Sequence, residues 1–242
     1  MRCCECHLVF LGNPPPPELL MTELDWDIHK NHVRAHRRKQ MGKIYYLMSD
    51  GIKKTRAFFR SFSSKKEHRY IMRFSAGPNI LDVGCGEGHI LAGLPESMVP
   101  YGIEPSPGMH QRADQVLRAR GGFCVHNISH LGLAELPDDI RFDLVLMRSF
   151  LEHDVMAEET LRTCLSKLAP NGKVLIKVPN FNCWNSKLRG SNWPGIRNPD
   201  HVNYFTPQTL SRFVLKCGYS RCHIPAVWRL PTSDNLWALA FR

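Results

Sequence analysis

From residue 80 onward, the chain alternates short apolar runs with amphipathic segments. A strand covered on both faces is apolar throughout, so the run at 142–147 predicts a buried strand. Residues 107–120 place Met109, Ala113 and Leu117 at helical spacing, which predicts an amphipathic helix. The same reasoning predicts strands at 80–83, 99–103, 122–126, 142–147, 173–178, 220–226 and 236–241, and helices at 107–120, at 157–168 and from Pro207, with Thr206 as the N-cap. Strands that alternate with helices predict an α/β fold.

Glycines follow the first of these strands at every second position. Asp82 precedes Gly84, Gly86 and Gly88, so the spacing is G-x-G-x-G and not the G-x-G-x-x-G of the dinucleotide fingerprint. Glycine adopts backbone angles closed to other residues and carries no side chain, so such a loop can turn sharply against a ligand. A tight strand-to-helix turn without a ligand is the alternative interpretation.

The motif Asp82-x-Gly84-x-Gly86-x-Gly88 resembles motif I of the class I S-adenosylmethionine (SAM) dependent methyltransferases, whose signature is E/D-x-G-x-G-x-G. The resemblance implies a Rossmann-like fold with a seven-stranded, mostly parallel sheet and helices on both faces. It also implies that SAM is the cofactor and that these four residues bind it.

Three further residues are predicted at the cofactor site. Glu104 ends the second strand about twenty residues past the glycines, where a carboxylate accepts hydrogen bonds from ribose hydroxyls. Capping the next helix is its alternative role, which Ser106 could also fill. Asn127 follows the third strand, where the resemblance implies an Asp or Asn that binds the adenine amino group; an ordinary turn asparagine is the alternative. Arg148, at the end of the fourth strand, is also assigned to the cofactor.

The segments after the fourth and fifth strands extend the resemblance. The run Phe142-Asp143-Leu144-Val145, followed by Leu151-Glu152-His153, is similar to the small-molecule methyltransferases related to the ubiquinone O-methyltransferases. The cadence from Leu168 to Pro179-Asn180 matches the same group. The similarity runs from residue 79 to residue 242. These motifs specify a fold and a cofactor, but they do not specify the methyl acceptor.

Two histidines are the candidate catalytic residues. His153 lies just past the fourth strand, and its imidazole titrates near neutrality, which suits a general base for a hydroxyl acceptor. A histidine at a helix start that hydrogen-bonds the backbone is the alternative. His201 is the second candidate for the base.

A polar, aromatic and glycine-rich loop lies between the fifth strand and the helix from Pro207. Long loops of this kind tend to carry function, so the segment is predicted to act as a lid over the substrate. An ordinary covering loop is the alternative. The predicted substrate-binding residues are Asn180, Trp184, Trp193 and Tyr204.

The net charge of +10 is concentrated near the N-terminus. Residues 30–73 contain fourteen Lys or Arg and two acids, whereas residues 74–242 contain seventeen and fifteen. We therefore predict a basic, helical N-terminal arm at 1–73 and a methyltransferase domain at 74–242. Basic residues interleaved with aromatics can bind a nucleic-acid backbone, but a solvated helical layer is the favoured interpretation.

Nine cysteines, an odd number scattered among predicted elements, are typical of reduced thiols, so a cytoplasmic location is expected. Cys3 and Cys6 have the spacing of half a zinc knuckle, and some related proteins carry a complete zinc ribbon at this place. A second cysteine pair is missing, so the segment is interpreted as vestigial and no metal site is predicted. No apolar run is long enough to span a membrane.

The sequence thus predicts transfer of a methyl group from SAM to a nucleophile, with a hydroxyl on a small molecule or sugar as the favoured acceptor. A nucleic-acid methyltransferase that uses the basic arm is one alternative, and a non-catalytic SAM-binding protein is another. A dehydrogenase is disfavoured by the glycine spacing. The sequence gives no oligomeric state.

Overall fold

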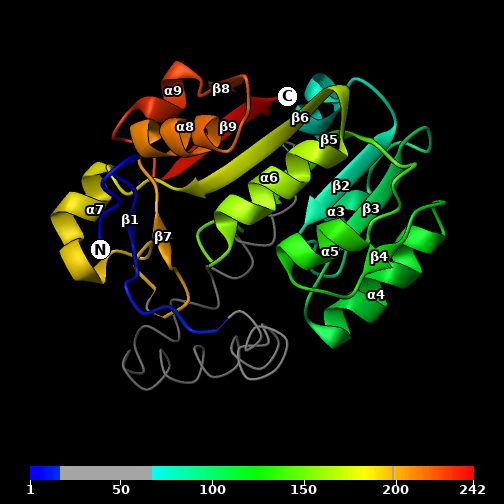
Figure 1. Cartoon of the computed structure of the whole chain (residues 1–242), viewed down its shortest axis with the longest axis horizontal. Coiled ribbons are helices and arrows are strands. Elements are labelled where there is room, and N and C mark those ends of the chain that lie inside the picture. Colours follow the sequence, from blue (N-terminus) through cyan, green and yellow to red (C-terminus); the bar gives the residue numbers. More distant parts are fainter. Residues whose placement is uncertain (17–66, 198) are drawn as a thin grey trace, which may run out of the picture.

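The structure, a computed structural model, describes residues 1–16, 67–197 and 199–242 (Figure 1). Most of the predicted helical arm lies between residues 17 and 66, outside the described part, so its structure stays a prediction. Residues 67–74 are helical and pack beside the sheet, because Ile71 belongs to the core on one of its faces.

A seven-stranded sheet with the order β4-β3-β2-β5-β6-β9-β8 forms the centre of the molecule. Neighbouring strands from β4 to β6 run parallel, and β9 is antiparallel to both β6 and β8. Its strands are β2 (Asn79–Val83), β3 (Val99–Ile103), β4 (Cys124–Val125), β5 (Phe142–Arg148), β6 (Leu168–Pro179), β8 (Arg221–His223) and β9 (Asn235–Phe241). The predicted seven-stranded, mostly parallel sheet is confirmed.

Helices cover both faces of this sheet, as predicted (Figure 1). The described helices are α3 (His89–Ala92), α4 (Pro107–Arg118), α5 (Ser129–Glu135), α6 (Ala157–Lys167), α7 (Trp184–Arg189), the 3-10 turn η2 (Gly190–Asn192), α8 (Pro207–Lys216) and α9 (Ala226–Arg229). The predicted N-cap of α8 is confirmed, because Thr206 and Thr209 exchange two hydrogen bonds in a capping box.

Side-chain alternation along the central strands divides the interior into two cores. On β5, Val145 and Met147 face the core that includes α5, α6 and α8, whereas Leu144 and Leu146 face the core that includes α3 and α4. All four side chains are fully buried, which contributes about 1.5–3 kcal/mol each. A central strand with both faces covered explains why its sequence is apolar without interruption.

Three predicted strands differ from the structure by two or more residues at one end. The strand predicted at 122–126 is reduced to the two residues of β4 at the sheet edge. The strand predicted at 173–178 begins earlier, as β6, because Leu168 pairs with Phe142 across a register shift. The strand predicted at 220–226 ends at His223, since Pro225 cannot donate to a ladder and precedes α9.

The first eleven residues dock onto the second half of the chain. Strand β1 (Val9–Phe10) pairs with β7 (Asn203–Tyr204) in a separate two-stranded sheet, at one side of the molecule in Figure 1. The Leu11 N–H donates to the Val202 carbonyl at 2.8 Å. The boundary at residue 73 stays a prediction, and this docking places residues 1–11 in contact with the larger unit.

Cys3 and Cys6 face each other in the turn before β1, both as free thiols. Backbone N–H groups of Cys6 and Glu5 lower the pKa of the Cys3 thiol, whereas burial raises the pKa of Cys6. Within the described ranges, neither cysteine belongs to a group of three candidate metal ligands.

No helix in those ranges is long and apolar enough to cross a membrane.

Candidate cofactor and acceptor site

The glycine loop after β2 adopts the left-handed backbone that its sequence predicts. Gly84, Gly86 and Gly88 have φ values of +75°, +59° and +74°, where other residues are strained. A side chain built at Gly86 would meet no atom within 4 Å, so open space lies directly over the loop. This cradle fits a cofactor that approaches the backbone closely, as the SAM assignment requires.

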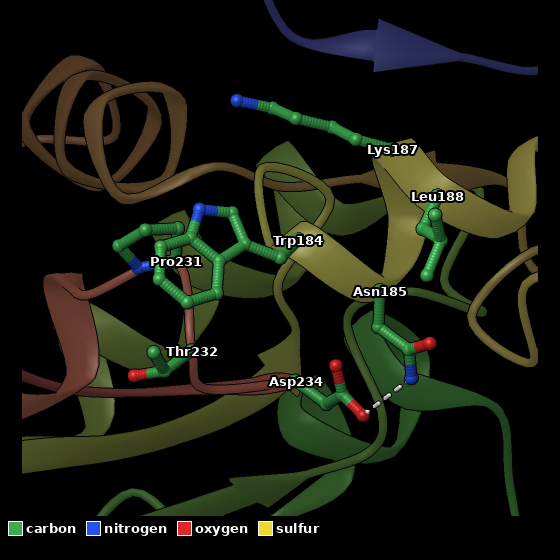
Figure 2. Close-up of a pocket in the computed structure, with 7 residues that line it drawn as sticks. All are labelled: Trp184, Asn185, Lys187, Leu188, Pro231, Thr232 and Asp234. Atoms are coloured by element: carbon green, nitrogen blue, oxygen red, sulfur yellow. Dashed lines mark hydrogen bonds between the residues drawn. The ribbon is translucent and has the colours of Figure 1, made fainter.

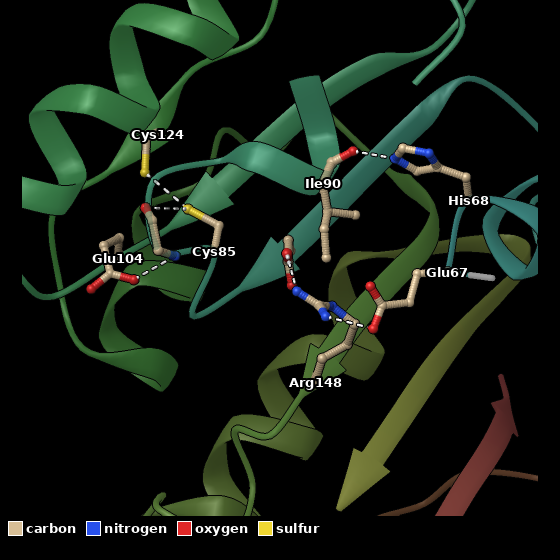
Figure 3. Close-up of polar contacts among 9 residues, drawn as sticks. Glu67, His68, Cys85, Ile90, Glu104, Cys124 and Arg148 are labelled. Carbon is tan, nitrogen blue, oxygen red and sulfur yellow. Dashed lines mark hydrogen bonds and ion pairs between the residues drawn. The ribbon is translucent and has the colours of Figure 1, made fainter. Parts of the chain in front are cut away.

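Glu104 reaches this loop from the end of β3. Its Oε2 accepts a hydrogen bond from the Gly86 N–H at 2.8 Å (Figure 3). Its Oε1 accepts one from the Ser106 N–H at 3.0 Å. Ser106 is the N-cap of α4, but its hydroxyl makes no capping bond. Glu104 therefore accepts N–H groups from both the glycine loop and the N-cap residue of α4, and its contact with the ribose stays a prediction.

Arg148 lies between two acids at the end of β5. Its guanidinium donates to Glu67 at 2.9 Å and lies 4.0 Å from Asp82 (Figure 3). Burial raises the pKa of Asp82 to about 7, against the opposing effect of Arg148. The predicted contact of Arg148 with the cofactor stays a prediction, and Glu67 is a partner that the sequence did not indicate.

Asn127 is engaged locally in the structure. Its amide donates to Glu135 at 2.6 Å, and its carbonyl accepts the Ile128 N–H at 2.7 Å. Both contacts join Asn127 to residues no more than eight positions away in the chain, so its side chain is held locally. Its role toward adenine stays a prediction: the adenine amino group would donate to the Asn127 carbonyl, which already accepts the Ile128 N–H.

The chain turns sharply where β5 ends. Ser149 has φ +50°, an uncommon value for a residue other than glycine, and its N–H donates to the Lys177 carbonyl. This turn places Phe150 against Gly84, where an added Cβ would lie 2.8 Å from the ring. The segment that carries Glu152 and His153 is therefore adjacent to the cofactor loop.

His153 and His201 meet at this edge of the sheet. Their ring centroids lie 4.5 Å apart with the planes nearly perpendicular. His153 Nδ1 lies 2.9 Å from the Asp200 carbonyl, and His201 Nδ1 lies 2.8 Å from the Gly195 carbonyl. His201 is buried, and burial lowers its pKa to about 4, so its imidazole is neutral near pH 7.

Glu152 completes this group, and its role was missed by the sequence analysis. Glu152, His153 and His201 each offer a candidate metal-ligating atom, and these atoms lie within 4.8 Å of one another. Burial raises the pKa of Glu152 to about 8. A leucine and a histidine flank Glu152 in the sequence, so only the tertiary structure reveals that this carboxyl points inward.

Hydrogen bonds tie the loop of His201 to the segment of His153. The N–H groups of Val202 and Asn203 both donate to the Glu152 carbonyl, at 2.7 and 3.1 Å. The Asn203 amide donates to the carbonyls of Leu151 and Asp154. The two histidines are thus held together by backbone contacts, independently of their rings.

The four predicted substrate residues do not form one cluster. Asn180 is buried and bonds Ser233 and Asn182, which gives its side chain a structural role. Trp193 is buried, and Tyr204 is partly buried, and both rings contact Phe181. Trp184 is 62% exposed. Their contact with a substrate stays a prediction.

Trp184 lines an open pocket of about 750 Å³ between α7 and the segment before β9 (Figure 2). An Asn185–Asp234 hydrogen bond of 3.0 Å crosses its floor. The other lining residues are Lys187, Leu188, Pro231 and Thr232. Neither histidine nor the glycine loop lines this pocket.

Comparisons with known proteins agree with this geometry. A family model described as a methyltransferase domain matches residues 41–223. The chain is 29% identical over 164 residues to the tRNA U34 carboxymethyltransferase of Edwardsiella ictaluri, covering 65% of this chain and 49% of that protein. It is 28% identical over 168 residues to the ubiquinone biosynthesis O-methyltransferase of Bradyrhizobium diazoefficiens, covering 65% of each. The chain spans less than two thirds of both curated relatives.

The fold recurs in a solved structure. The SAM-dependent methyltransferase of Archaeoglobus fulgidus superposes with a TM-score of 0.60 at 20% identity, covering 76% of this chain and 94% of that one. The sheet order, the glycine loop and the acid at the end of β3 define the Rossmann-like, SAM-binding class. The chain belongs to the methyltransferase domain family, and SAM is its cofactor.

Proposed function

We propose that this protein transfers a methyl group from SAM to a hydroxyl oxygen of a small molecule or sugar. The observation that carries the proposal is the group of Glu152, His153 and His201 at the same sheet edge as the glycine loop. The relation to a ubiquinone biosynthesis O-methyltransferase supports a hydroxyl acceptor.

Bound SAM supplies a methyl group already activated by its sulfonium, which becomes a neutral thioether when the acceptor oxygen takes the methyl carbon. The chain has to align the acceptor, exclude water and accept one proton. Asp82, Glu104 and the glycine loop hold the cofactor in this proposal. His153, which is partly exposed, takes the hydroxyl proton, and the Asp200 carbonyl orients its ring.

A screen of phenolic, sugar and nucleic-acid acceptors tests the proposal by following release of S-adenosylhomocysteine. Transfer to a hydroxyl that falls about 100-fold or more in His153→Ala would support it. The matched control is His223→Ala, an exposed histidine on β8. Transfer only to nitrogen or carbon acceptors would contradict it, and so would wild-type turnover in His153→Ala.

A nucleic-acid acceptor is the second candidate. It is supported by the similarity to a tRNA carboxymethyltransferase and by the positive charge of residues 30–73. Release of S-adenosylhomocysteine that depends on added tRNA, with no response to phenols or sugars, would favour this candidate over the first.

We also propose a cytoplasmic location. All nine cysteines are free thiols, and Cys85 and Cys124 remain unbridged although their sulfurs lie 3.7 Å apart. Free thiols are typical of proteins kept in a reducing compartment. Fluorescence microscopy of a tagged chain in its own cells tests this location.

A further inference from the structure

Glu152, His153 and His201 have the chemistry of a metal site. Two imidazole nitrogens and one carboxylate oxygen are a common donor set for zinc and for other divalent transition metals. Across the described ranges, they are the one group of three such residues whose donor atoms lie within 4.8 Å of one another. Ligands of one tetrahedral ion lie roughly 3.5 Å apart, so side-chain shifts of about 1 Å would complete the geometry.

Backbone contacts fix which ring nitrogen of each histidine carries the lone pair. A carbonyl oxygen only accepts, so the Nδ1 atoms that face Asp200 and Gly195 must donate. The neutral tautomer then has its lone pair on Nε2 in both rings. Metal-binding histidines are typically held in this way, with the far nitrogen donating to a carbonyl or carboxylate.

Glu152 gives an independent indication of a missing cation. Its side chain is buried, and its Oε2 has no hydrogen-bond partner within the described structure. Buried polar oxygens are normally satisfied, because an unsatisfied one costs about 1–3 kcal/mol. A bound cation would satisfy this oxygen.

We propose that Glu152, His153 and His201 bind one divalent transition-metal ion, with Zn²⁺ as the first probe. The site is held by tertiary structure, since the carbonyl of Glu152 accepts the N–H groups of Val202 and Asn203. Three protein ligands leave at least one position open, which is the pattern of a catalytic and not a structural zinc site.

The open position has a use that rests on the proposed function. A hydroxyl oxygen bound there would have a lowered pKa, because the cation stabilises the alkoxide or phenolate. The proton would leave to solvent, and His153 would then act as a ligand instead of a base. Metal binding and hydroxyl methylation are measured separately, so failure of one does not decide the other.

Calorimetric titration of the chelator-treated full chain with Zn²⁺ tests the proposal. All proteins carry Cys3→Ser, Cys4→Ser and Cys6→Ser, so that the N-terminal thiols do not compete. We expect one equivalent to bind, with affinity reduced about tenfold or more in Glu152→Gln and in His201→Gln. The control His223→Gln should keep the affinity.

Co²⁺ provides a second readout that does not depend on activity. Substitution should give visible d–d bands without thiolate charge-transfer absorption, and these bands should disappear in His201→Gln. Circular dichroism and SAM affinity confirm that each variant is folded. Absence of saturable Zn²⁺ binding would overturn the proposal. Zn²⁺ binding that is unchanged in both Glu152→Gln and His201→Gln would also overturn it.

Discussion

At the residue scale, the glycine loop gives the sharpest test of the cofactor site. Gly86→Val should abolish measurable SAM binding, because the new side chain would fill the open space over the loop. Isothermal titration with SAM measures the effect. Gly84 is a poorer choice, since a side chain there would also strike Phe150.

Gly121→Val is the matched control for Gly86→Val. Gly121 has φ +81° and open space for a side chain, so the substitution carries similar backbone strain away from the loop. The control should lose stability but keep its SAM affinity. Unchanged SAM affinity in a folded Gly86→Val protein would remove the loop from the cofactor site.

Glu104 should contribute through hydrogen bonds to the ribose. Glu104→Ala is expected to weaken SAM binding by about 1–3 kcal/mol, the usual cost of losing a charge-assisted acceptor. Competition against radiolabelled SAM measures this, with the exposed Glu96→Ala as control. Equal affinities in the two variants would leave Glu104 as a structural residue of the loop and α4.

Asp82 predicts a pH dependence of stability. Its pKa is raised to about 7 in the folded protein, from an ordinary value of 3.8. Between these values the folded state keeps a proton that the unfolded state has lost, so stability falls as pH rises through this window. Arg148, Glu67 and Glu104 are the charged groups that act on it.

The melting temperature of the wild type should therefore fall between pH 5 and pH 8 more steeply than that of Asp82→Asn. The exposed Asp139→Asn should behave like the wild type. Identical slopes for wild type and Asp82→Asn would mean that Asp82 is ionised throughout this range.

Some contacts of the candidate site follow from local chain order, whereas others depend on the tertiary fold. Gly86 and Glu104 follow strands at a fixed spacing, so the chain order alone places them together. Glu67 and Glu152 were missed because their partners are distant in sequence: Glu67 bonds Arg148, 81 positions away. Asn180 fits the pattern of a substrate residue, yet its amide donates to the Ser233 carbonyl in the segment before β9.

At the element scale, β1 and β7 connect the N-terminal segment to the loop of His201. Leu11→Pro removes the N–H that donates to Val202, whereas the control Leu11→Ala keeps it. We expect Leu11→Pro to raise the acceptor KM several-fold and leave SAM affinity unchanged. Steady-state kinetics and SAM titration measure the two effects. A parallel loss of SAM affinity would contradict this division.

Element boundaries were predicted accurately where they depend on local sequence and missed where they depend on a distant partner. Both faces of β5 are apolar and buried, and this continuous apolar run predicted the strand accurately. β6 begins five residues earlier than predicted, because pairing with Phe142 overrides the turn chemistry of Pro170 and Gly172. Short elements such as β1 and β7 exist only through each other, which no local pattern reveals.

At the scale of the whole molecule, the uneven distribution of charge allows a test of whether the basic arm binds nucleic acid. Six basic residues of the arm, outside the described part, are tested by exchange to Gln: Lys53, Lys54, Arg56, Arg60, Lys65 and Lys66. We expect activity on a small acceptor to remain within about twofold, because charge on a solvated layer governs partners and solubility.

RNA affinity measured against salt concentration decides the alternative. Each phosphate contact that is lost removes about one released counterion and flattens the slope. A steep slope in the wild type that is lost in the Gln variant would promote the nucleic-acid candidate.

The pairing of β1 with β7 also sets an order of events during synthesis. Val9 can pair only after Tyr204, nearly two hundred residues later in the chain, has been synthesised. Strands β2, β3 and β5 pair with one another over a much shorter stretch. Contacts that close long loops form late, because their entropy is lost before the contacts stabilise anything. A growing chain is therefore expected to form the glycine loop of the cofactor site first. His153 and His201 are expected to reach their final positions only after the N-terminal segment has paired with β7.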